Sequence, residues 1–92
     1  MPNISSFHGM NIYMYRGDHL PPHFHVEYAE YEVTFNILAF KIIEGYMPRN
    51  KLKLVVEWTN KYRKDLLENW ELCNQKKLCW QGIPLKKIPP LQ

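Results

Sequence analysis

The 92-residue sequence predicts one α+β domain, a small antiparallel β-meander of four to five strands that is covered on one face by one long or two bent C-terminal helices. Two observations carry this prediction. Residues 1–47 alternate apolar and polar side chains in short runs, which is the pattern of half-buried strands. Residues 48–80 contain no Gly and no Pro after Pro48, and their apolar side chains recur at helical spacing. Residues 81–92 hold three prolines and are expected to form an extended tail that docks on its own domain or on a partner.

The predicted strands are separated by turn residues. Gly17 and Asp18 mark one turn, and the Pro21-Pro22 pair prevents regular ladder pairing before the next strand begins. An antiparallel sheet with this alternation has one apolar and one polar face. The expected strands cover residues 3–7, 10–15, 23–28, 31–37 and 41–45.

The second half is predicted to be helical because no Gly or Pro follows Pro48 until Gly82. On a helical wheel at about 100° per residue, its main apolar stripe occupies an arc of about 80°. This stripe would lie across the apolar sheet face, on one helix or on two with a bend near residues 60–63. Trp58 falls outside the stripe and is expected at the sheet margin, although an exposed Trp there could anchor a partner. The stripe consists of Leu52, Val55, Thr59, Tyr62, Leu66, Trp70 and Cys73.

The composition excludes several protein classes. A hydrophobic fraction of 46% is typical of a folded globular domain and not of a disordered chain. No apolar run reaches the roughly 18 residues that a membrane-spanning helix needs, and residues 1–10 lack the pattern of a secretion signal. The two cysteines, Cys73 and Cys79, form no disulfide framework and are expected to be free thiols, so the sequence favours a cytoplasmic protein.

The net charge of +3 divides unevenly along the chain. Residues 1–47 carry two basic and five acidic side chains, a net of −3, whereas residues 48–92 carry ten basic and four acidic ones, a net of +6. A basic surface attracts nucleic acid or an acidic partner, and a solvated helix surface explains the same charge equally well. The basic strip expected on the helix surface consists of Arg49, Lys53, Arg63 and Lys64.

The most unusual stretch is "DHLPPHFHVEY", which contains three of the four histidines. Alternate side chains of a strand point to one face, so His23, His25 and Glu27 should line up on the polar face. His19 lies just before the Pro pair, and Tyr15 belongs to the neighbouring predicted strand. A single His on a strand is usually an ordinary polar residue. Three with a carboxylate within nine residues favour a functional site.

Two kinds of chemistry suit this histidine block. In the first, two of the imidazoles of His19, His23 and His25 act as acid and base in metal-free cleavage of a phosphodiester, with Arg16 or Tyr15 stabilising charge. In the second, the imidazoles hold zinc or another divalent metal, although their spacing matches no established metal signature. The acidic character of this half favours a bound cation over RNA phosphate. The metal ligands would be His19, His23, His25 and Glu27.

The chain contains the stretches "MPNISSFHGMNIYMY", "DHLPPHFHVEY", "IIEGYMPRNKLKLVVEW", "LLENWEL" and "PLKKI". In these, which cover nearly its whole length, it resembles the bacterial family catalogued as domain of unknown function 4160. The resemblance implies small cytoplasmic proteins that are often encoded beside another small protein, in a toxin–antitoxin-like arrangement. It brings no established reaction.

The chain departs from the family pattern at some positions. His8 stands where an aromatic Tyr is common, and Ala29 stands where Gly is usual. Tyr62 stands where a His is frequent, so this chain lacks any contribution of that His to a site. The segment "ILAFK" replaces a Gly-containing hairpin turn, which must therefore be built differently, and "CNQKKLCWQ" is longer than expected.

The leading functional expectation is one component of a toxin–antitoxin-like pair that acts through the polar, histidine-bearing sheet face. Its partner would be a small protein encoded nearby. If this chain is the toxin, the expected activity is RNA binding or cleavage, with the basic strip holding phosphate.

Two alternatives stay open. One is a metal-binding module without catalysis. The other is a purely structural interaction protein that works through the basic strip, Trp58 and the tail. A homodimer could also form by strand addition at residues 3–7 or at the tail.

Overall fold

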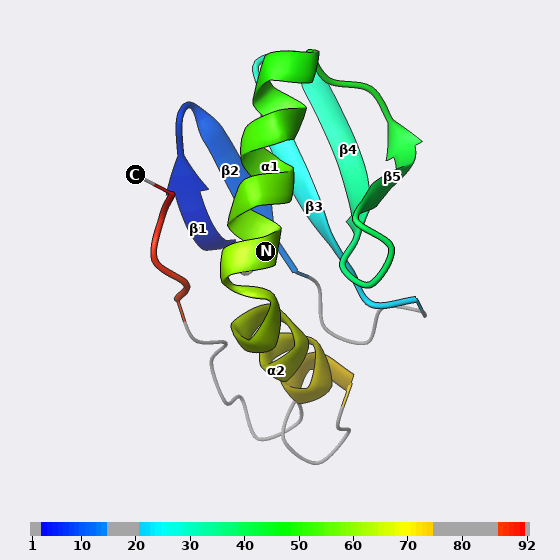
Figure 1. The fold of residues 1–92 in the computed structure, drawn as a ribbon, viewed down its shortest axis with the longest axis vertical. Helices are drawn as coiled ribbons and strands as arrows, with labels where there is room; N and C mark the ends of the chain where they lie inside the picture. The colour runs from blue at the N-terminus through cyan, green and yellow to red at the C-terminus, as the bar shows by residue number, and fades with distance from the viewer. Residues whose placement is uncertain (1–2, 15–20, 75–86, 92) are drawn as a thin grey trace.

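The computed structural model describes residues 3–14, 21–74 and 87–91, and it confirms the predicted fold class. Five strands form one antiparallel sheet in chain order, and two helices follow. In Figure 1, the first helix lies across one face of the sheet and the second continues beyond its end. The strands are β1 (Asn3–Phe7), β2 (Met10–Tyr13), β3 (His23–Tyr28), β4 (Tyr31–Asn36) and β5 (Lys41–Gly45). The helices are α1 (Arg49–Lys61) and α2 (Arg63–Asn74).

The core lies between the apolar sheet face and α1. Its centre is Trp58, which is fully buried. The Trp58 ring lies 5.2 Å from the Phe7 ring and 5.5 Å from the Phe24 ring, measured between centroids. Strand alternation supplies the rest of the apolar face, as expected from the period of two. The sheet residues buried on this face include Met10, Ile12, Phe24, Val26, Val33 and Phe35, and Met14, just after β2, is buried as well.

The position of Trp58 corrects the expectation that it packs at the sheet margin. The predicted stripe assumes that residues 52–73 present a single face to the sheet, whether on one helix or on two. The structure instead breaks the helix at Tyr62, so the buried side of α1 is set independently of α2 and includes Val55, Trp58 and Thr59. Leu52 and Tyr62 are only half-buried, and the side chain of Cys73 lies outside the described residues.

The helix break falls within the predicted interval of residues 60–63. Tyr62 has backbone angles φ −114° and ψ 24°, and its N–H donates to the Trp58 carbonyl at 3.0 Å. The next helix begins at once, since the Leu66 N–H donates to the Tyr62 carbonyl at 2.9 Å. Leu66 and Trp70 are buried as expected, so α2 adds a second packed layer beyond the end of α1. Over the described residues, neither helix has the length and apolar character needed to cross a membrane.

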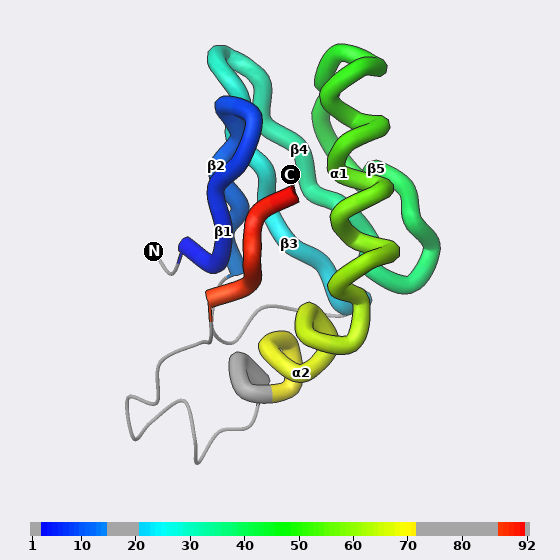
Figure 2. The backbone as a smooth tube through the Cα atoms, turned by 60° about the vertical axis from the view of Figure 1, so that its left-hand side comes forward, coloured from blue at the N-terminus to red at the C-terminus, as the bar shows by residue number. Residues whose placement is uncertain are grey.

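Residues 87–91 of the expected tail dock on their own domain. The Ile88 N–H donates to the Ile4 carbonyl of β1 at 2.8 Å, and the Trp58 indole N–H donates to the Pro89 carbonyl at 2.9 Å. Figure 2 shows this segment between β1 and α1. Because Ile88 and Leu91 are buried there, the segment belongs to the core and occupies part of the β1 edge.

Three hairpin turns place non-glycine residues in the left-handed backbone region. His8 (φ 48°) and Gly9 (φ 78°) form the two-residue turn between β1 and β2, and a positive φ at both positions is what a type I′ turn requires. Ala29 has φ 51° in the turn between β3 and β4. The "ILAFK" turn has Phe40 at φ 53°, and the Asn36 side-chain oxygen accepts from two backbone N–H groups at 2.9 Å each.

Replacing Ala29 by Gly should raise the free energy of unfolding by about 0.5–1 kcal/mol, since the left-handed penalty exceeds the extra entropy cost of Gly. Urea unfolding measures this change. The matched control is Ala39→Gly, because Ala39 has no positive φ and should therefore lose stability. Equal effects of the two changes would contradict the turn geometry.

Replacing Gly45 by Ala should lower the free energy of unfolding by at least about 2 kcal/mol. Gly45 has φ 88°, and an added Cβ would collide with the Glu32 carbonyl oxygen and lie 3.0 Å from the Val33 Cα. Gly9→Ala is the control. Gly9 has a similar φ of 78°, but its Cβ would meet only Tyr28 ring atoms, the nearest at 3.5 Å, so we expect a smaller loss of about 1 kcal/mol. A Gly45→Ala protein as stable as the Gly9→Ala protein would contradict this packing.

Candidate functional site

The two faces of the sheet differ in what covers them. α1 and residues 87–91 lie on the apolar side, and α2 lies beyond the end of the sheet (Figures 1 and 2). Among the described elements, only α2 reaches the opposite side, at the start of β3. We call the sheet face opposite α1 the open face. Strand alternation and pairing place on it Ser6, Asn11, Tyr13, His23, His25, Glu27, Glu32, Thr34, Asn36, Lys41 and Glu44.

The strand register arranges these side chains in cross-strand rows. Directly paired residues have side chains on the same face about 4.5–5.5 Å apart at Cβ, so each row is a set of neighbours. The two-residue turn between β3 and β4 fixes this register, because it pairs Tyr28 with Tyr31. The central row is Tyr13, His25, Thr34 and Glu44. One flanking row is Asn11, Glu27 and Glu32, and the other is His23, Asn36 and Lys41.

His25 lies at the centre of the open face and is half-buried. Its Nδ1 is 3.3 Å from the Thr34 hydroxyl, which can donate to or accept from the ring. The imidazole also meets the His23 ring edge-on, with centroids 5.2 Å apart and an interplanar angle of 82°. His25 is therefore held in place by its neighbours while part of its ring stays accessible to a ligand.

His23 is on the same face as predicted, but it is only 2% exposed. Its Nδ1 lies 2.7 Å from the Pro21 carbonyl, and because a carbonyl only accepts, Nδ1 carries the proton. The ring packs on Trp70 of α2, with centroids 5.1 Å apart. His23 is therefore buried on this face, since α2 reaches the start of β3 and packs on it.

Glu27 and Glu32 stand directly opposite each other in one row of the open face. Glu27 is half-buried and Glu32 is exposed. Like charges in directly opposed positions destabilise a sheet. No basic side chain of the described residues pairs with either carboxylate on this face, where Lys41 belongs to the far row. The face therefore carries two carboxylates that a cationic group would stabilise.

Several predicted site residues lie outside the described residues. These are Tyr15, Arg16 and His19. Tyr13, the preceding open-face residue of β2, is paired with His25. Within the described ranges no group of three or more His, Cys, Asp or Glu side chains is placed to hold a metal ion. A metal site built on His25 would therefore need ligands from outside the described residues.

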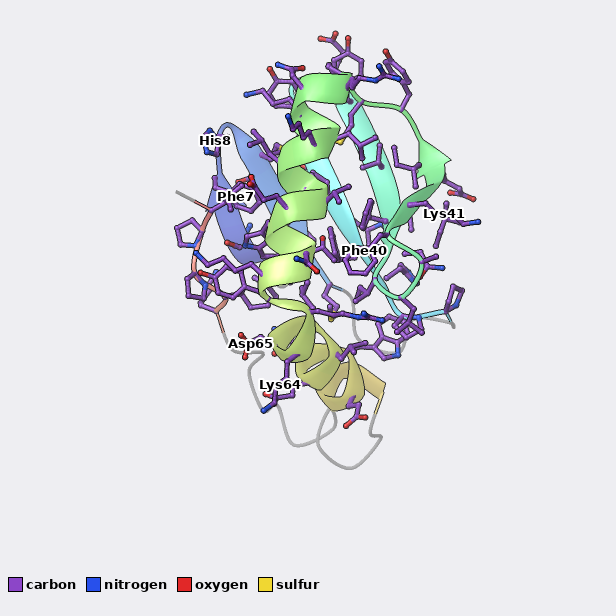
Figure 3. All side chains as sticks on the ribbon, in the orientation of Figure 1. Phe7, His8, Phe40, Lys41, Lys64 and Asp65 are labelled. Carbon is purple, nitrogen blue, oxygen red and sulfur yellow. The ribbon has the colours of Figure 1, made fainter. Side chains whose placement is uncertain are left out.

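The basic strip is not gathered around the histidines. Arg49 and Lys53 lie on α1, on the other side of the sheet from His25. The Arg63 guanidinium packs over the Phe40 ring at 5.1 Å from its centroid. Lys64 points outward from α2 (Figure 3). A single phosphodiester at His25 could not also contact Arg49 and Lys53.

Two contributors to the site were not expected from the sequence. Thr34 contacts His25, and Glu32 opposes Glu27. Both contacts follow from the register of the β3–β4 hairpin. Only two residues, Ala29 and Glu30, separate the two predicted strands, and this short linker could have predicted the register. The contact of His23 with Trp70 has no such signal, because it depends on where α2 lies.

His23 and His25 should differ in their effect on stability. His23→Ala removes a buried ring and leaves the packing of Trp70 incomplete, so it should lower the free energy of unfolding by about 2 kcal/mol or more. His25→Ala removes a half-exposed ring and should cost less than about 1 kcal/mol. Urea unfolding of both proteins tests this difference, and equal losses would contradict the packing role of His23.

A comparison of the sequence with models of protein families gives a match. The model of the family described as "Domain of unknown function (DUF4160)" matches residues 9–71, which is more than half of the chain. The chain therefore belongs to this family. No curated protein and no solved structure matches it significantly.

Proposed function

We propose that this member of the DUF4160 family is one component of a two-protein, toxin–antitoxin-like pair and that it binds its partner protein through the open face. The observation that carries the proposal is that face itself. It is a polar sheet surface that the described elements leave uncovered except at the start of β3, with His25 at its centre. The open face offers a rigid platform, since its side chains are fixed by strand pairing.

The charge of the open face indicates the kind of partner surface. Glu27, Glu32 and Glu44 stand against one cation, Lys41. Arg or Lys side chains from a partner would relieve the repulsion between Glu27 and Glu32 and form charge-assisted hydrogen bonds. Tyr13 and His25 beside them supply ring surface and hydrogen-bonding groups of the kind that anchor protein interfaces. The proposed partner is thus a protein with a basic contact surface.

RNA cleavage is a second candidate, and the contact between the two imidazoles favours it. Two neighbouring histidines can supply an acid and a base for phosphodiester cleavage. Burial leaves His23 only 2% exposed, so His25 would need a second group from outside the described residues. The carboxylates of the face also repel phosphate. These two features place RNA cleavage behind protein binding.

The charge argument predicts which substitutions weaken partner binding. The protein encoded beside this chain is purified and titrated calorimetrically against the native chain and a Glu27→Gln/Glu32→Gln double variant. Loss of two charge-assisted contacts should weaken binding at least about tenfold. Glu68→Gln/Glu71→Gln, which removes two exposed carboxylates from α2, is the matched control and should change the dissociation constant less than about twofold.

The outcomes separate the candidates. Equal weakening by both double variants would reject the open face as the binding surface, and failure of the native chain to bind would reject the pair. Ribonuclease activity of the purified chain that disappears in His25→Ala would support the second candidate. One equivalent of zinc or another divalent metal that is lost in a His19→Ala/His25→Ala variant would instead assign the face to metal binding.

A further inference from the structure

A second surface lies on α1, on the other side of the sheet from the open face. It is a depression of about 420 Å³. The lining side chains that belong to the described residues all come from one helix and recur at spacings of three and four, so they form one stripe along α1. We call this stripe the α1 groove, and it consists of Arg49, Leu52, Lys53, Val56 and Glu57.

The α1 groove has an apolar floor and a charged rim. Leu52 and Val56 are half-buried beside the core, because Val55, Trp58 and Thr59 on the neighbouring face of α1 pack on the sheet. The rim side chains are Arg49, Lys53 and Glu57, and all three are exposed. A groove of this composition suits a protein segment that brings apolar side chains and compensating charges.

The charges of the α1 groove run in one direction along the helix. Its two basic side chains, Arg49 and Lys53, precede the acidic one, Glu57. Arg49 is the first residue of α1, and the first turn contains no acidic residue. A cation at this end is repelled by the positive end of the helix dipole, so an acidic group brought close to Arg49 would stabilise this end of α1. An antiparallel copy of the same stripe presents its acid at this end.

We propose that the chain forms a homodimer in which α1 of a second copy packs antiparallel on the α1 groove. With the two-fold axis at the level of residue 54, Leu52 faces Val56 of the second copy, and the contact occurs twice. Glu57 of the second copy then lies midway between Arg49 and Lys53, about 3 Å from each along the helix axis at a rise of about 1.5 Å per residue. The two-fold repeats these ion pairs, so every rim charge finds an opposite partner.

A second copy fits this groove better than an unrelated acidic segment. An acidic partner would satisfy Arg49 and Lys53 but would leave Glu57 facing like charge. Only a partner with the reverse order of charge satisfies all three side chains, and the antiparallel copy has this order by symmetry. The α1 groove and the open face lie on different sides of the sheet, so the dimer leaves the open face free for the proposed partner.

Sedimentation equilibrium with charge-reversed variants tests the proposal. The native chain should sediment at twice the mass of the 11.1 kDa chain at about 100 µM, a concentration at which a weak dimer is populated. Arg49→Glu/Lys53→Glu makes the whole rim acidic, and Glu57→Lys makes it basic. Each variant alone should be monomeric. Their equimolar mixture should recover the doubled mass, because the acidic rim of one matches the basic rim of the other.

Each remaining outcome overturns the homodimer. A native chain that stays monomeric at 100 µM rejects it. Variants that remain dimeric show that the copies associate through another surface, such as the edge of β5, where Ile43 is 45% exposed. A mixture that stays monomeric rejects the antiparallel charge pairing. Far-UV circular dichroism confirms that both variants are folded, which the exposed positions of all three side chains lead us to expect.

Discussion

Trp58 joins the sheet, α1 and the C-terminal segment in one core, and the arrangement of these elements depends on its burial. Its ring packs on Phe7 of β1 and Phe24 of β3 from the middle of α1. Its indole N–H donates to the Pro89 carbonyl at 2.9 Å, which ties the C-terminal segment to the same core. An indole buries more apolar area than most side chains and needs one hydrogen-bond partner when buried. One residue therefore fixes the sheet, α1 and the segment at residues 87–91 on one side.

The open face is the consequence of this one-sided core. Because the described covering elements gather around Trp58, the polar residues of the strands are left without a second layer. The exception is the start of β3, where Trp70 packs on His23. This contact divides the histidine block into one residue that positions α2 and one, His25, that faces outward. His23 and His25 lie on the same face of β3, yet His23 serves packing and His25, in the proposed function, serves recognition.

The strands and the helix break were predictable from the sequence because both are local properties. Alternation places Phe24 and Val26 opposite His25, and Tyr62 lies at the expected bend. The burial of Trp58 was not predictable from a helical wheel, since the wheel gives the apolar arc of a helix but not its rotation against a sheet. The burial of His23 depends in the same way on α2. The opposition of Glu27 and Glu32 on the open face could have been predicted from the sequence, because a two-residue hairpin turn determines which side chains are opposed.

The central claim is that His25 belongs to a partner-binding face while His23 belongs to the core. Modification of imidazoles by diethyl pyrocarbonate, read by mass spectrometry with and without the protein encoded beside this chain, tests both halves at once. His8, exposed in the first hairpin turn, is the internal reference. The account predicts that His8 reacts in both states, that His25 reacts in the free chain and is protected in the complex, and that His23 reacts slowly throughout. Equal reactivity of His25 in both states, or modification of His23 as fast as that of His8, would contradict it.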